Sequence, residues 1–66
     1  MPDSSTSSGK RITRILVVDD HPLVREGLAA RISPQPDMEI CGEAASLNEA
    51  LDQVRATHPD LCIIDI

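Results

Sequence analysis

Apolar and polar side chains follow one another along this chain with two different periods, and the changes of period predict five elements. Residues 15–18 and 61–64 are short, wholly apolar runs, each followed by a carboxylate, which is typical of strands buried on both faces of a parallel sheet. Further along, Met38, Ile40 and Gly42 alternate with Glu39 and Glu43. This period of two predicts a short, half-exposed strand near a sheet edge.

The segment between the first two predicted strands carries apolar residues at helical spacing. The predicted helix begins at Pro22, whose fixed φ suits a first helical position, and ends before Pro34. Its apolar stripe consists of Leu23, Val24, Gly27, Leu28 and Ile32. A glycine inside a helix costs about 1 kcal/mol relative to alanine, so we expect another group to approach Gly27 closely.

The segment between the last two predicted strands also predicts a helix. It opens with Ser46-Leu47-Asn48-Glu49, a capping-box pattern in which the Ser hydroxyl and the Glu carboxylate satisfy backbone amides. Pro59 ends the segment. The positions that share one helical face are Leu47, Ala50, Leu51 and Val54.

The order strand, helix, strand, helix, strand predicts an α/β fold with an open parallel sheet and right-handed crossovers. Residues 1–12 are polar and serine-rich without periodicity, so we expect a disordered tail there and one domain over residues 13–66. The chain stops at Ile66, one residue after the carboxylate that follows the last apolar strand. We therefore expect a truncated domain.

Composition excludes several classes of function. Six Lys and Arg against eleven Asp and Glu, with no aromatic residue, provide neither a basic stripe nor a stacking platform, so we expect no binding of nucleic acid by these residues. The longest apolar runs are four residues, which excludes a membrane span and a secretory signal. The expected compartment is the cytoplasm.

The two cysteines, Cys41 and Cys62, have no metal-site spacing and are expected to be reduced core residues.

Three carboxylates follow the two fully apolar strands. Asp19 and Asp20 come after the first strand and Asp65 after the last, and the carboxyl ends of parallel strands meet at one edge of a sheet. Converging carboxylates repel one another, and a hard divalent cation such as Mg²⁺ removes that cost. A carboxylate beside Mg²⁺ can also attack phosphorus. The alternative is that the three acids are solvated strand ends or helix caps.

His21 follows the acids directly and could be a metal ligand or a proton carrier. No second His or Cys lies nearby, so the pattern favours a residue that only begins the helix.

Taken together, these segments resemble a known family. Residues 15–28, which include Val17-Val18-Asp19-Asp20, look like the first strand and helix of a response-regulator receiver domain. Residues 39–44 resemble its second strand, and residues 59–66 the strand that presents the phosphoacceptor. The resemblance is strongest to the NarL/FixJ subfamily, whose receivers usually precede a LuxR-type helix-turn-helix.

The resemblance implies a flavodoxin-like fold, with the first strand between the second and the third. It implies that Asp65 accepts a phosphoryl group from a phosphohistidine on a sensor histidine kinase. Asp20 would bind Mg²⁺ directly, and Asp19 would hold it through a water. The implied role is phosphorelay signalling rather than enzymatic turnover, with transcription controlled through a DNA-binding domain that this chain lacks and a possible receiver–receiver dimer in the full-length protein.

The implied strand order also bears on the cysteines. It places Cys41 and Cys62 roughly 9 to 10 Å apart across the first strand, beyond the reach of a disulfide. The family's hydroxyl residue after its fourth strand and its lysine after its fifth have no counterpart within the 66 residues.

Other interpretations remain at this point. The chain could be an inactive truncated gene product. Flavodoxin-like cobalamin-binding modules have D-x-H-x-x-G after their first strand, but Val24 stands at the glycine position. Haloacid-dehalogenase-type phosphatases use D-x-D, which the adjacent Asp19 and Asp20 do not match.

Overall fold

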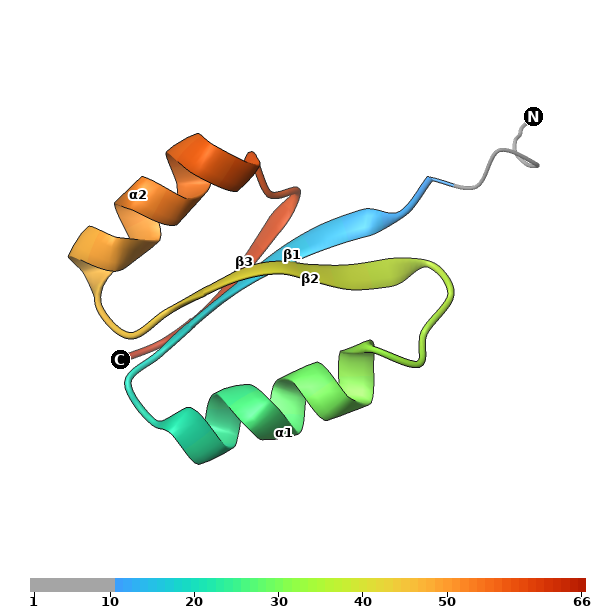
Figure 1. Ribbon diagram of the computed structural model, residues 1–66, viewed down its shortest axis with the longest axis horizontal. Coiled ribbons are helices and arrows are strands. Elements are labelled where there is room, and N and C mark those ends of the chain that lie inside the picture. The colour runs from blue at the N-terminus through green and yellow to red at the C-terminus, as the bar shows by residue number, and fades with distance from the viewer. Residues whose placement is uncertain (1–10) are drawn as a thin grey trace.

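The computed structural model describes residues 11–66, which form a three-stranded parallel sheet with one helix on each face (Figure 1). The elements, in chain order, are β1 (Thr13–Asp19), α1 (Pro22–Ile32), β2 (Met38–Ala44), α2 (Leu47–Thr57) and β3 (Leu61–Asp65). The strand order is β2-β1-β3, which confirms the predicted order and its central first strand. Most of the predicted tail, residues 1–10, lies outside the described part of the chain.

The centre of the fold is β1, whose side chains are buried on both faces, as predicted. Leu16 and Val18 form one cluster with Ala44 and with Ala50 of α2. On the opposite face, a second cluster under α1 contains Ile15, Val17 and Ile32. Burying one such aliphatic side chain contributes about 1.5–3 kcal/mol, so β1 anchors both layers.

The edge strand β2 departs from simple alternation at Cys41. Ile15 pairs with Ile40 and Leu16 with Gly42, so Cys41 is the extra residue of a bulge. Cys41 packs against the cluster beneath α2, where its Sγ lies 3.5 Å from the Thr57 hydroxyl. The prediction of a reduced core cysteine is confirmed here, and the predicted edge strand is also confirmed.

The apolar stripe predicted for α1 is only partly buried. Ile32 is buried and Leu28 packs against the same cluster, but Leu23 is 80% exposed and Val24 is exposed as well. The prediction of a close approach at Gly27 is wrong, because no atom lies within 4 Å of the position that a Cβ would occupy. Leu23 and Val24 therefore face solvent in the described part of the chain.

The capping prediction for α2 is confirmed. The Ser46 hydroxyl accepts the Glu49 N–H at 3.2 Å, and the Glu49 carboxylate accepts the Ala45 N–H at 2.9 Å, one residue earlier than in the usual box. His58 ends the helix in the left-handed conformation, with φ of 49°, before Pro59.

The prediction that the last strand is buried on both faces is not met among the described residues. Only Ile63 of β3 is partly buried, and Cys62 is exposed, so the expectation of a core position for Cys62 is wrong. Both helices lie over β1 and β2, and neither comes close to β3. Ile63 packs at the border of the cluster under α1, whereas Leu61 and Ile64 are left exposed.

Hydrogen bonds from Asp60 join the start of β3 to the start of β1. Asp60 accepts the Arg14 N–H at 2.9 Å and the Arg11 guanidinium at 2.8 Å, and the Asp60 N–H donates to the Arg14 carbonyl at 2.8 Å. The Arg14 guanidinium donates to the Thr57 carbonyl at the end of α2. These bonds set the register in which β3 starts beside β1.

No helix within residues 11–66 combines the length and the apolar character needed to cross a membrane.

Candidate functional site

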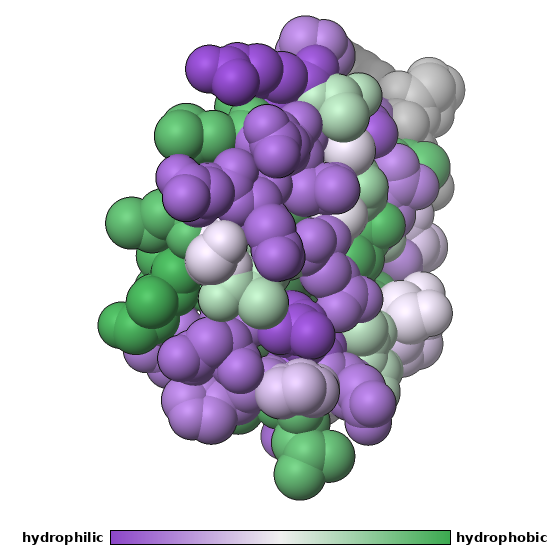
Figure 2. All heavy atoms as spheres, turned by 60° about the vertical axis from the view of Figure 1, so that its left-hand side comes forward, coloured by the Kyte–Doolittle hydropathy of each residue, from purple (hydrophilic) through white to green (hydrophobic). Residues whose placement is uncertain are grey.

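The predicted acids lie at the carboxyl edge of the sheet. Asp19 is the last residue of β1, Asp65 is the last residue of β3, and the parallel register pairs them directly. Asp20 follows in the turn that leads to α1. In Figure 1 the C-terminus lies beside that turn, and Figure 2 brings this end forward and shows mainly hydrophilic side chains across its centre.

Asp19 is the buried member of the group, with 1% of its surface exposed. Its Oδ1 accepts the backbone N–H of His21 at 2.9 Å and lies 3.0 Å from His21 Nδ1. The His21 backbone bond lowers the pKa of Asp19 most, burial opposes it, and the charges of His21 and Arg25 lower it further. Asp19 is therefore an ionised carboxylate held inside the edge of the sheet.

His21 joins the two adjacent acids. Its Nδ1 lies 2.8 Å from Asp20 Oδ1, and 72% of its side chain is exposed. The bond to Asp19 raises the pKa of His21 most, followed by the charges of Asp20 and Asp19, and Asp65 adds to the effect. The electrostatic field at this edge thus favours a positive charge between the carboxylates.

Sequence reasoning undervalued His21. The residue does begin α1, as its N-cap, but its side chain makes no capping hydrogen bond and contacts the acids instead. The available signal was its position directly after two carboxylates.

The donor set fits a hard cation. Ligand atoms of Asp19, Asp20 and His21 lie within 4.8 Å of one another, and the buried carboxylate needs a compensating positive charge. Carboxylate oxygens suit Mg²⁺, which takes few protein oxygens and keeps several waters. Asp65 lies opposite Asp19 in the register but is not in this group of close ligand atoms. The structure thus brings two of the three predicted acids together and places the third beside them.

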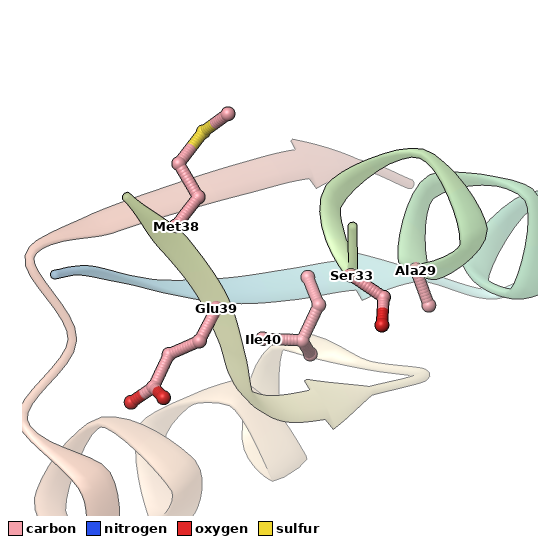
Figure 3. A pocket seen from close by; sticks show the side chains of 5 residues that line it. All are labelled: Ala29, Ser33, Met38, Glu39 and Ile40. Carbon is pink, nitrogen blue, oxygen red and sulfur yellow. The ribbon is translucent and has the colours of Figure 1, made fainter. Parts of the chain in front are cut away.

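A shallow depression of the surface lies at the other end of the sheet. Figure 3 shows its lining: Ala29 and Ser33 at the end of α1, and Met38, Glu39 and Ile40 at the start of β2. It is remote from the strand ends that carry the acids, so it plays no part in their chemistry.

Comparisons with known proteins agree with this geometry. The family model described as the response regulator receiver domain matches residues 15–66. The DNA-binding transcriptional activator DevR/DosR of Mycobacterium tuberculosis is 36% identical over 55 residues, which cover 83% of this chain and 25% of that protein. The response regulator protein VraR of Staphylococcus aureus is 42% identical over 53 residues, which cover 80% of this chain and 25% of VraR. The chain thus spans about a quarter of the length of these relatives.

A solved structure extends the likeness to three dimensions. The crystal structure of the response regulator domain of Thermotoga maritima CheB is similar with a TM-score of 0.76 and 38% identity. The match covers 79% of this chain and 39% of that one.

Proposed function

Because the chain belongs to the response regulator receiver family, we propose that it acts in a two-component phosphorelay with Asp65 as the residue that accepts the phosphoryl group. The observation that carries this assignment is the position of Asp65. It ends β3, is exposed, and pairs in the register with the buried acid that ends β1. An exposed carboxylate at a strand end is accessible to a donor that is itself a protein.

The proposed donor is a phosphohistidine of a sensor histidine kinase. A carboxylate oxygen of Asp65 attacks the phosphorus and forms a P–O bond, while the P–N bond of the donor breaks. The leaving imidazole nitrogen keeps the electron pair of the broken bond. The product is an acyl phosphate on Asp65, which the chain retains as a signal rather than turning over a substrate.

The proposed metal ligands are Asp19, Asp20 and Asp65, with Mg²⁺ as the cation. When bound, Mg²⁺ supplies positive charge that offsets the charge on the transferring group. Asp20, exposed at 52%, would bind the ion directly, and the buried Asp19 would hold one of its waters. The His21 side chain contacts the carboxylates of Asp19 and Asp20. It must therefore move away from them when the cation binds.

Transcriptional control is the proposed output. It is supported by the relative whose name describes a DNA-binding transcriptional activator, of which this chain matches about a quarter. DNA binding and receiver–receiver dimerisation would belong to the corresponding full-length protein. We place the relay in the cytoplasm, in line with the family and with the unpaired Cys41 and Cys62.

A phosphorylation assay with acetyl phosphate and Mg²⁺, in buffer that contains trimethylamine N-oxide to favour the folded state, tests the acceptor. We expect the intact chain to gain the mass of one phosphoryl group, and hydroxylamine to remove it, since an acyl phosphate is labile to that nucleophile. Asp65→Asn abolishes the gain because the amide is not a nucleophile toward phosphorus.

Asp52→Asn is the matched control, because it makes the same change at an exposed acid of α2. It is expected to be phosphorylated like the unmodified chain. Equal phosphorylation of Asp65→Asn and Asp52→Asn would refute the assignment.

A further inference from the structure

Arg25 of α1 reaches back across the carboxyl edge of the sheet. Its Nε lies 3.2 Å from Glu43 Oε1 near the end of β2, and a terminal nitrogen donates to the carbonyl oxygen of Asp19. The Arg25 side chain is only 19% exposed, whereas that of Glu43 is 47% exposed. One planar guanidinium thus joins the ends of β1 and β2 to the first turns of α1.

The carbonyl that Arg25 holds belongs to the peptide that joins Asp19 to Asp20. Fixing this peptide limits the directions that the Asp20 carboxylate can take. Within residues 11–66, that carboxylate contacts the exposed ring of His21. The orientation of the Asp20 carboxylate therefore depends strongly on the conformation of the Asp19–Asp20 peptide.

We propose that Arg25, oriented by Glu43, is a positioning residue that holds the Asp19–Asp20 peptide in the conformation that binds Mg²⁺. The inference rests on the metal site of the proposed function and deepens it. Groups that orient metal ligands typically change metal affinity by about 10–100-fold when they are removed.

The sign of the effect separates positioning from charge. The positive charge of Arg25 repels a cation nearby, so a residue that acted by charge alone would weaken Mg²⁺ binding, and its removal would strengthen it. A positioning residue has the opposite effect on removal. Arg25→Lys also separates the two explanations. Lysine keeps the positive charge, but its single ammonium group cannot contact Glu43 and the Asp19 carbonyl as the planar guanidinium does.

The test is a Mg²⁺ titration of the 66-residue chain, followed through its amide chemical shifts in buffer that contains trimethylamine N-oxide, an osmolyte that favours the folded state. We expect Arg25→Gln and Arg25→Lys to weaken Mg²⁺ binding by about tenfold or more. Glu43→Gln, which leaves Arg25 in place without its ion pair, is expected to have a smaller effect in the same direction. Arg31→Gln removes the same charge from the last turn of α1 and should leave the affinity unchanged.

Tighter binding by Arg25→Gln, or unchanged binding by Arg25→Lys, would overturn the proposal. Loss of dispersed amide signals in both Arg25→Lys and Glu43→Gln would also overturn it, because the contact would then support the whole fold. If Arg25→Lys alone loses dispersion, the sign of the change in Mg²⁺ affinity of Arg25→Gln decides, because charge and positioning predict opposite signs for it. Failure of the unmodified chain to bind Mg²⁺ would instead count against the proposed metal site.

Discussion

Asp19 and Asp20 are adjacent in sequence but differ in environment. Asp19 is buried and accepts the backbone N–H of His21, whereas half of Asp20 faces solvent. We expect Asp20→Ala to lower Mg²⁺ affinity more than Asp19→Ala does, and to leave the free energy of unfolding nearly unchanged. Asp19→Ala should also destabilise the fold, because the His21 amide loses its acceptor.

Paired Mg²⁺ titrations and urea unfolding of the two variants, both in buffer that contains trimethylamine N-oxide, measure these effects. Equal losses of affinity, or a destabilised Asp20→Ala, would argue against the separate roles of the two acids.

Asp60 provides a pH-dependent contribution to stability. The backbone bond from Arg14 lowers the pKa of Asp60 most, burial opposes it, and the charge and hydrogen bond of Arg11 lower it further. The ionised carboxylate therefore stabilises the fold above its unfolded-state pKa, and this contribution is lost as the pH falls through the lowered folded-state pKa.

We expect Asp60→Asn to be less stable than the unmodified chain at about pH 6, and the difference to shrink toward about pH 2. Urea unfolding at the two pH values, with sucrose added to favour the folded state, measures it, with Asp52→Asn as the control. A difference that did not change with pH would contradict this role for Asp60.

At the scale of elements, the surroundings of Gly42 and Gly27 predict opposite effects of an alanine substitution on stability. A Cβ at Gly42 would lie 2.4 Å from Gln53 Oε1 and 3.3 Å from Leu16 Cδ1, where α2 packs on β2, whereas a Cβ at Gly27 would meet open space. We expect Gly42→Ala to destabilise the fold by only about 1 kcal/mol, because the flexible end of Gln53 can move aside and the buried Leu16 methyl must shift slightly. Gly27→Ala should stabilise it by about 0.5–1 kcal/mol through its higher helix propensity.

Urea unfolding of both variants, in buffer that contains trimethylamine N-oxide to favour the folded state, checks the signs. Adding Gln53→Ala to Gly42→Ala should restore part of the loss, because the Gln53 side chain is the nearest obstacle. A destabilised Gly27→Ala would show that α1 is packed more tightly than the structure indicates.

The same elements show what the sequence could predict. The apolar run of β1 and the Ser46–Glu49 box gave the correct elements because strand burial and helix capping depend on residues close in sequence. The bulge at Cys41 and the exposure of Leu23 were not foreseeable, because both depend on how elements pack against one another. At the site, the edge and its acids were predicted, but the contact of His21 with them is a tertiary detail.

At the scale of the whole molecule, the described chain leaves much apolar surface uncovered. The exposed large apolar side chains are Ile12, Leu23, Val24, Leu47, Leu51, Val54, Leu61, Ile64 and Ile66. A chain of about 60 residues buries only about 60% of the surface that its unfolded form exposes, so stability is marginal even with a well-covered core. We therefore expect poorly dispersed amide signals in plain buffer, and increased dispersion when trimethylamine N-oxide is added.

Amide spectra and thermal unfolding of the 66-residue chain test this expectation. A cooperative transition together with fully dispersed signals in plain buffer would contradict it.

The register that sets Asp19 beside Asp65 joins positions far apart in the chain and exists only when the sheet has formed. A ligand that needs both residues binds the folded state alone, so by mass action it adds RT ln(1 + [L]/Kd) to the free energy of unfolding. At a ligand concentration of about 100 times Kd, this is about 2.7 kcal/mol. For a chain with so small a margin, the concentration of its ligand would help to determine what fraction of the molecules is folded.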